Sequence, residues 1–429
     1  MGGDMMTALG RAAADGHTLF GHNAAGRSQA PFRLERTPGG SHAPDERVRA
    51  TFIALPQARR THAVLGGRLA GAWGYCHGVN EHGVAAGCTR LRTRLLLDAP
   101  GLTGPDLVRL ALERGPTARQ ALEALTGLVA RHGQGAFPGC GDEDGHDAAF
   151  LIADGREAFL VEASGPGWVC QEVREVRAAS NVGTVRQDWD AIAPGLAGRV
   201  IERGWWPEDG SKLDFAGALA VKTDDADSAL RRWGQATRLL EEQSGHIDAA
   251  FLRRVLADHY EGSEDEVDPH DPGASPEPLC CHACASRPSA TVASLVAVLG
   301  AEVALAWWAF GPPCGAVYLP LLPAGELPPE LTGAGDLDAR LARLAAAADD
   351  PALGGKARAA LEGLQALLDA EAAEFLVEAA ALKGNGCAED LGRQATFFMQ
   401  HAWEQFEEVT DGLLGSSRLP VAGPHLPVY

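Results

Sequence analysis

The chain has 429 residues and a formal net charge of −20 at pH 7, with 46% hydrophobic and 22% charged residues. A chain of this length and apolar content can bury a large core. Because nucleic acids and anionic membrane surfaces attract clustered lysine and arginine, the acidic balance argues against both as partners.

Targeting and redox features favour a cytoplasmic protein. The sequence has no apolar run near the roughly 18 residues of a membrane-spanning helix. Its first twenty residues lack the basic start and apolar block of a signal peptide. The nine cysteines are an odd number spread over a long chain, which favours reduced thiols over a disulfide framework.

Short strands joined by tight turns are predicted for the first part of the chain. Residues Met5–Leu9 and Thr18–Gly21 are mostly apolar and flank the turn signal Asp15-Gly16. Two further hairpins with the same pattern are predicted at 71–91, bending at Asn80–Gly83, and at Ala148–Ala163, bending at Asp154-Gly155. These hairpins predict a sizeable antiparallel sheet.

Two helices are predicted between the second and third hairpins. The stretch "LTGPDLVRLALERG" has Thr103 as a helix cap, Pro105 in the first turn and Gly115 as the stop. The next helix begins at Thr117, whose distance along the chain from Gln120 is that of a capping box.

The second half of the chain changes character twice. Residues 259–290 are acidic and rich in proline and serine, which predicts an exposed loop. Two buried strands are expected within 291–322, and Asp336 to Leu414 is helical in pattern. Mixed strands and helices followed by helices alone predict the α+β class, with a first domain at 1–330 and a helical extension at 331–429.

Several stretches occur in an order that resembles a known family. They are "GDMMTALGRAAADGHTLFGHN", "WGYCHGVNEHGVAAG", "LTGPDLVRLALERG", "AASNVGT", "LCCHA", "TVASLVAVL" and "FGPPCGAVYLPL". Together, over about residues 3–320, they resemble the secernin-like cysteine dipeptidases, which are N-terminal-nucleophile hydrolases related to penicillin V acylases and bile salt hydrolases. The resemblance implies a four-layer α-β-β-α sandwich in which two antiparallel sheets lie face to face. It also implies hydrolysis of amide bonds by a leading cysteine whose own α-amine moves the proton.

The resemblance assigns five positions, two of which lack the expected side chain. Gly3 stands where the family has its nucleophilic cysteine, and Ala25 stands where an orienting aspartate is expected. His22 replaces the usual lysine or arginine. Asn80 and Asn181 stand at the two positions whose side chains hold the developing oxyanion. We therefore expect an amide-hydrolase homologue that is catalytically impaired.

There are other ways in which the chain could provide a nucleophile or have lost it, and each meets an objection. Removal of Met1 leaves an amine on Gly2, which has no side chain, and cleavage before Thr7 exposes a hydroxyl but destroys the first strand. A coding change at residue 3 explains the glycine there but not Ala25. Buried, unactivated thiols are expected at Cys76 and Cys88.

Two non-catalytic alternatives remain. The first is a protein that binds a small peptide or an acyl amide in the former pocket. The second is an interaction scaffold that uses the C-terminal helices. A homo-oligomer is compatible with each alternative.

Metal motifs in the sequence are incomplete. The run "CCHAC" at Cys280–Cys284 supplies one cluster of ligands, but structural zinc sites normally use two separated pairs. The acidic run at Gly139–Asp147 lacks the twelve-residue pattern of a calcium loop and reads as a solvated loop. We therefore expect no metal and no cofactor.

Overall fold

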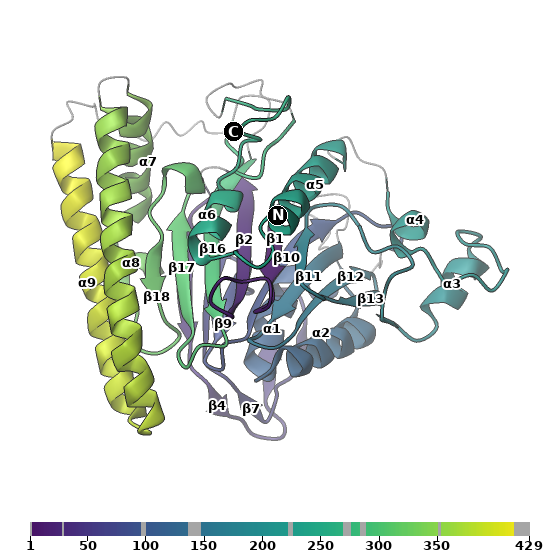
Figure 1. Ribbon diagram of the computed structural model, residues 1–429. Helices are drawn as coiled ribbons and strands as arrows, with labels where there is room; N and C mark the ends of the chain where they lie inside the picture. The colour runs from purple at the N-terminus through teal and green to yellow at the C-terminus, as the bar shows by residue number, and fades with distance from the viewer. Residues whose placement is uncertain are drawn as a thin grey trace, which may run out of the picture.

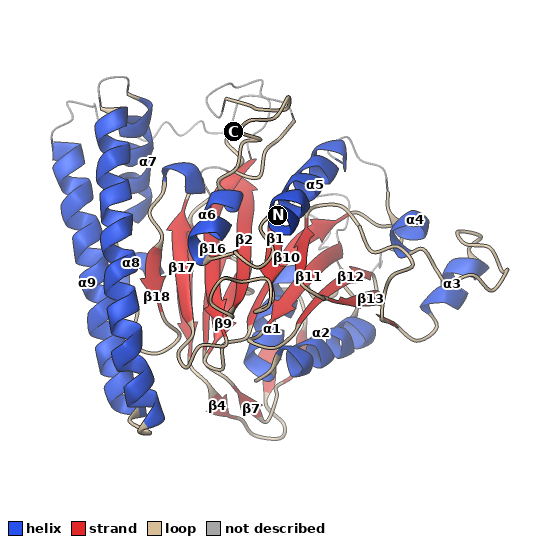
Figure 2. Cartoon of the chain, in the orientation of Figure 1, coloured by secondary structure: helices blue, strands red, loops and turns tan. Residues whose placement is uncertain are grey.

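The computed structural model describes residues 2–27, 30–95, 100–135, 147–221, 226–268, 276–283, 289–350 and 353–415. Figure 1 shows a central body of strands with helices around it, and Figure 2 colours the two kinds of element separately. The strands form two main antiparallel sheets, and among the described residues helices occur from Gly104 onward. The predicted α+β class is therefore confirmed.

The six-stranded sheet contains the N-terminal strand. Its strand order is β14-β1-β2-β16-β17-β18. The bounds are β14 Val176–Ala179, β1 Gly2–Ala8, β2 Thr18–Arg27, β16 Ser289–Leu299, β17 Leu305–Phe310 and β18 Leu319–Leu321. The N-terminal strand β1 therefore has a hydrogen-bonded neighbour on both sides over Met5–Ala8. Gly3, which pairs with β2 alone, is also buried.

The eight-stranded sheet contains the other two predicted hairpins. Its order is β15-β13-β12-β11-β10-β9-β8-β3. The bounds are β15 Ala191–Ile192, β13 Gly167–Glu172, β12 Ala158–Ser164, β11 Asp147–Ala153, β10 Ala85–Leu91, β9 His77–Asn80, β8 Val64–Leu69 and β3 Phe32–Thr37. Two small ribbons pair β4 (Gly40–Ser41) with β7 (Arg60–Thr61) and β5 (Arg47–Arg49) with β6 (Ala54–Pro56).

All three hairpins predicted from the turn signals are confirmed, as β1–β2, β9–β10 and β11–β12. The prediction for the second strand was too short, because β2 extends to Arg27. The reason is tertiary: β2 pairs with β1 on one side and with β16 on the other, so the sheet extends the strand beyond the apolar run.

Helices cover each sheet. Helices α1 (Gly104–Arg114) and α2 (Ala118–His132) pack on strands of the eight-stranded sheet. Helices α5 (Ala226–Glu242) and α6 (Ala249–Leu256) pack on β14, β1, β2 and β16 of the six-stranded sheet. The two sheets contact each other through β1 and β10. The short helices α3 (Leu196–Glu202) and α4 (Phe215–Leu219) follow β15.

The predicted caps of α1 and α2 are confirmed. Thr103 accepts a hydrogen bond from the Asp106 backbone N–H at 3.1 Å, and the Asp106 carboxylate accepts one from the Thr103 N–H at 3.0 Å. The Thr117 hydroxyl accepts from the Gln120 N–H at 3.2 Å. These bonds satisfy amide groups that a helix start leaves without partners.

The C-terminal region is helical, as predicted. After the 3₁₀ turns η1 (Pro313–Gly315) and η2 (Pro329–Thr332) come α7 (Leu337–Asp349), α8 (Gly354–Gly384) and α9 (Ala388–Gly415). The long helices α8 and α9 stand beside β18 at the edge of the six-stranded sheet (Figure 1). The division of the chain near residue 330 stays a prediction. No helix within the described ranges is long and apolar enough to cross a bilayer.

The segment predicted as an exposed loop at 259–290 differs from the prediction. Its described residues form no helix, but Leu279, Cys280 and Cys281 are buried, and β16 already begins at Ser289. The Leu279 carbonyl accepts a hydrogen bond from the Asn23 amide at 2.9 Å. This bond holds the segment against β2, so the acidic and proline-rich composition was a poor guide to its burial.

Candidate functional site around Gly3

Gly3 has a backbone conformation that excludes a side chain. It pairs with Ala24 across β1 and β2, and its φ angle is +149°. A Cβ atom built on Gly3 would overlap the backbone oxygen of Asn23 and lie 3.0 Å from Nε2 of His22. The position assigned to the nucleophile is therefore without a side chain and sterically closed to one.

Asn181 lies next to Gly3. Its side-chain oxygen accepts a hydrogen bond from the Gly3 N–H at 3.2 Å. Its NH₂ group donates to Thr89 Oγ1 at 2.8 Å and to the Arg90 carbonyl at 3.3 Å. Both amide hydrogens therefore have partners inside the protein, although the structure brings the side chain to the place that the sequence indicated.

Arg232 on α5, like its two acidic partners, was not assigned to this site from the sequence. Its guanidinium donates to Asp4 at 3.1 Å, to Glu277 at 2.8 Å and to the side-chain oxygen of Asn181 at 3.1 Å. Both Arg232 and Asp4 are buried. A signal was present in the sequence, since Arg232 lies on the apolar face of its helix, between Ala229 and Ala236.

The charges in this cluster are balanced against the cost of burial. Burial raises the pKa of the Asp4 carboxyl, and the nearby Arg232 charge opposes that rise. Burial also disfavours the charged guanidinium and is the largest single influence on it, but the combined attraction of Asp4, Cys281 and Glu277 outweighs burial, so the pKa of Arg232 is raised. Because the guanidinium stays charged and bonds both carboxylates, we interpret the cluster as an internal ion-pair network.

His22 forms a buried pair with His77. Their Nδ1 atoms are 2.8 Å apart, so one ring donates and the other accepts. Burial lowers the pKa of His22 to about 3 and also lowers the pKa of His77. Both rings are therefore neutral near pH 7, and His22 cannot supply the positive charge of the lysine or arginine that it replaces in the resemblance.

Ala25 and Asn23 complete the β2 side of the site. Ala25 pairs with Gly2 on one side and Thr291 on the other, and it places a methyl group where an aspartate was expected. The Asn23 amide donates to the carbonyls of Leu256 at 2.8 Å and Leu279 at 2.9 Å. Asn23 thereby joins β2 to the end of α6 and to the following segment.

Asn80 makes its contacts elsewhere. Its NH₂ group donates to the carbonyls of Leu112 at 3.0 Å and Gly115 at 2.8 Å, at the end of α1. Its side-chain oxygen accepts from the backbone N–H groups of His82 and Val84, both at 3.0 Å. Asn80 therefore fastens the β9–β10 turn to helix carbonyls that would otherwise lack partners, and it has no amide hydrogen left for a substrate.

The Thr89 hydroxyl and the thiols of Cys76 and Cys88 are poor substitutes for a leading cysteine. Thr89 Oγ1 donates its hydrogen to the Gly3 carbonyl at 2.8 Å, so its proton is not bound to a base. Burial raises the pKa of Cys76 to about 11, and it raises the pKa of Cys88 as well. A protonated thiol is a weak nucleophile.

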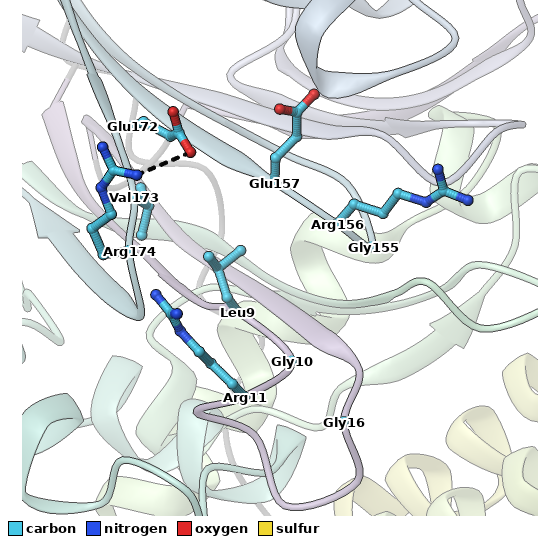
Figure 3. Close-up of a pocket in the computed structure, with 10 residues that line it drawn as sticks. All are labelled: Leu9, Gly10, Arg11, Gly16, Gly155, Arg156, Glu157, Glu172, Val173 and Arg174. Carbon is cyan, nitrogen blue, oxygen red and sulfur yellow. Dashed lines mark hydrogen bonds and ion pairs between the residues drawn. The ribbon is translucent and has the colours of Figure 1, made fainter. Parts of the chain in front are cut away.

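Neither of two cavities in the described part of the chain is lined by Gly3. One, of about 470 Å³, lies near the β1–β2 turn and is lined by Leu9, Arg11, Arg156, Glu157 and Arg174 among others. Figure 3 shows the charged side chains around it and the ion pair between Glu172 and Arg174. A second cavity of about 450 Å³ is lined by residues of α5 and α6 and by His259 and Cys314.

Two groups of side chains among the described residues could hold a metal ion. One consists of His259, Cys280, His282 and Cys314, and the other of His62, Glu81 and His82. The acidic run predicted as a solvated loop at 139–147 lies outside the described residues, except for Asp147.

Comparison with known proteins gives weak likenesses. No protein-family model matches the sequence. A penicillin V acylase from Agrobacterium tumefaciens is 11% identical with a TM-score of 0.42, covering 74% of this chain and 86% of that chain. A conjugated bile acid hydrolase from Clostridium perfringens is 12% identical with a TM-score of 0.40, covering 71% and 88%. An N-acylethanolamine-hydrolyzing acid amidase ortholog from Caenorhabditis elegans is 11% identical with a TM-score of 0.35, covering 69% and 92%. At these values the likeness carries no argument about activity or substrate.

Proposed function

We propose that this protein is a secernin-like amide-hydrolase homologue that does not hydrolyse amide bonds. Its fold would be the four-layer α-β-β-α sandwich of the N-terminal-nucleophile hydrolases. The packing of α1 and α2 on one sheet and of α5 and α6 on the other supports this arrangement, as does the contact between the sheets.

The backbone of Gly3 is the observation that carries the proposal. A lost side chain alone is a single substitution, which a second change can reverse. Here the main chain also has a φ angle of +149°, and a Cβ atom would overlap the Asn23 carbonyl. The strand has therefore adapted to the absence of a side chain at this position.

The polar groups around Gly3 support the same proposal. Stabilising an oxyanion requires hydrogen-bond donors that point at the place where the charge develops. Both amide hydrogens of Asn181 are bonded to Thr89 and Arg90, and all three contacts of Arg232 are internal. These groups hold the protein together instead of facing a substrate.

A turnover assay tests the proposal. Purified full-length protein would be incubated with dipeptides and with N-acyl amino acids, and release of the free amine would be measured. We expect no release above the rate in buffer. Turnover that is retained through purification and is lost in Asn181→Ala would overturn the proposal, because a contaminating hydrolase would not respond to that substitution.

A second candidate function is the binding of a small peptide or acyl amide without cleavage. The observation that favours it is Nε2 of His22, a buried nitrogen beside Gly3 that has no hydrogen-bond partner among the described residues. A buried polar atom without a partner costs about 1–3 kcal/mol, and a ligand carbonyl or amide would relieve that cost. A thermal-shift screen with peptides and acyl amides tests it, since a ligand that binds only the folded chain raises the melting temperature. A positive compound should lose its effect in His22→Phe.

A further inference from the structure

Four side chains from distant parts of the sequence meet beside α6. His259 follows that helix, Cys280 and His282 lie in the segment before β16, and Cys314 lies in η1 after β17. The separations along the chain are 23 residues from His259 to His282 and 32 residues from His282 to Cys314. The sequence motif around Cys280 showed half of this group, and the fold supplies the other half.

The distances within the group match a tetrahedral metal centre. Nε2 of His282 lies 3.3 Å from Nε2 of His259, 3.5 Å from Sγ of Cys280 and 3.3 Å from Sγ of Cys314. Tetrahedral zinc bonds to nitrogen and sulfur place two nitrogens about 3.3 Å apart and a nitrogen and a sulfur about 3.5 Å apart. All four ligand atoms lie within 4.8 Å of one another.

We propose that His259, Cys280, His282 and Cys314 form a Cys₂His₂ site for a zinc ion. Two imidazoles and two thiolates are a ligand set that suits zinc, and four protein ligands fill its coordination sphere. The site therefore has a structural role, distinct from the former nucleophile position at Gly3.

Hydrogen bonds around the four side chains preorganise them for binding a metal ion. Nδ1 of His259 lies 3.1 Å from the Glu261 carboxylate, which orients the ring, and Nε2 lies within 4.8 Å of the other three ligand atoms. Metal-binding histidines commonly have such a carboxylate partner. The backbone N–H of Cys280 donates to the Asp258 carbonyl at 3.2 Å, which joins the two ligand-bearing segments before any ion binds.

Burial is graded across the group. His259 and Cys280 are buried, His282 is half-buried and Cys314 is exposed. The cavity lined by His259 and Cys314 reaches the group from one side. An ion therefore has a way in, and a chelator has a way to remove it.

The zinc would fasten a segment that also forms the site around Gly3. The same segment supplies the Leu279 carbonyl to Asn23 and the Glu277 carboxylate to Arg232. A zinc ion at its end would hold these contacts in place. This role does not depend on whether the protein hydrolyses amides.

The test measures zinc in purified full-length protein. After dialysis we expect one zinc per chain by mass spectrometry of the elements, and cobalt in its place should give the visible absorption of a thiolate-bound ion. Cys314→Ser removes an exposed ligand and is therefore the variant with the least risk to folding. We expect it to lose both signals, whereas Glu261→Gln should weaken zinc affinity by about 10–100-fold.

Matched controls assign any metal to its site. The variant His62→Ala with His82→Ala removes the other candidate group, and Cys387→Ser removes a thiol outside both groups; each should keep one zinc per chain. Three results would overturn the proposal: protein that takes up no zinc, zinc that is lost with His62 and His82 instead, or a disulfide between Cys280 and Cys314 in freshly purified protein. A chelator should lower the melting temperature of the native chain but not that of Cys314→Ser.

Discussion

Replacement of Gly3 by alanine is the sharpest test of the backbone argument. The substitution adds one methyl group in the interior of β1, where φ is +149° and the Asn23 carbonyl occupies the space. The substitution removes no hydrogen-bonding group, because the backbone N–H and carbonyl that bond Asn181 and Thr89 are the same in alanine. The loss of stability therefore measures the cost of placing a side chain at residue 3.

The magnitude follows from two separate costs. A side chain held in a sparsely populated backbone region costs about 1–3 kcal/mol. Forcing an extra methyl group into a packed interior costs roughly another 1–3 kcal/mol. We therefore expect Gly3→Ala to lower the free energy of unfolding by about 2–6 kcal/mol, a large part of the roughly 5–15 kcal/mol of a typical domain.

Two glycine controls separate these costs. Gly16 has a φ angle of +78° with open space around it, so Gly16→Ala carries the backbone cost of about 1–2 kcal/mol alone. Gly127 lies within α2 with open space, so Gly127→Ala should stabilise by up to about 1 kcal/mol. Urea unfolding followed by tryptophan fluorescence measures all three. A Gly3→Ala variant no less stable than Gly16→Ala would refute the reasoning.

Three further predictions concern the buried polar groups. Arg232→Met leaves the Asp4 carboxylate without its ion-pair partner and should lower the free energy of unfolding by about 3–5 kcal/mol. The double variant with Asp4→Asn should recover part of that loss in urea unfolding. No recovery would contradict the ion-pair interpretation. Asn80→Ala removes four hydrogen bonds and should cost about 3–5 kcal/mol, whereas a loss below 1 kcal/mol would mean that the turn does not depend on that amide. Burial raises the pKa of Asp147 from 3.8 to about 7, so the folded chain keeps a proton that the unfolded chain releases. Stability should therefore fall as pH rises from about 4 to 7. In Asp147→Asn the midpoint of urea unfolding should change less with pH over that range. If the midpoint depends on pH as strongly in the variant as in the native chain, the pKa of Asp147 is not shifted.

Local structure was predictable where a short signal decides it. Asp15-Gly16 and the Asn80–Gly83 bend mark turns because few other residues adopt the required backbone angles. Thr103 marks a helix start because its hydroxyl satisfies a free amide group. These signals depend on a few neighbouring residues, so the sequence contains all of the information.

The site was only partly predictable, because its contacts depend on the whole fold. Asn181 lies beside Gly3, as the resemblance implied. The sequence could not show that its side-chain NH₂ group donates to Thr89 and Arg90. Asn80 bonds carbonyls at the end of α1. The sequence shows that Asn80 lies in a turn, but it does not show which helix end the turn contacts. Arg232 acts across a distance of 228 residues from Asp4, which no local pattern records.

The zinc group shows the same limit. The sequence shows Cys280 and His282 as neighbours, and on that basis a second pair of ligands was missing. His259 and Cys314 come from the end of a helix and a turn after a strand, and only the packing of α6 against β16 and η1 brings them together. The composition of 259–290 also hid the burial of this segment.

A covalent trapping measurement tests the central claim, that no side chain of the N-terminal strand attacks an amide. Purified protein would be incubated with excess N-acyl amino acid, quenched with acid and digested, and the peptide that begins at the mature N-terminus would be analysed by mass spectrometry. The account predicts that residues 2–27 remain free of any acyl group. An acyl group attached to a side chain in that peptide would contradict it.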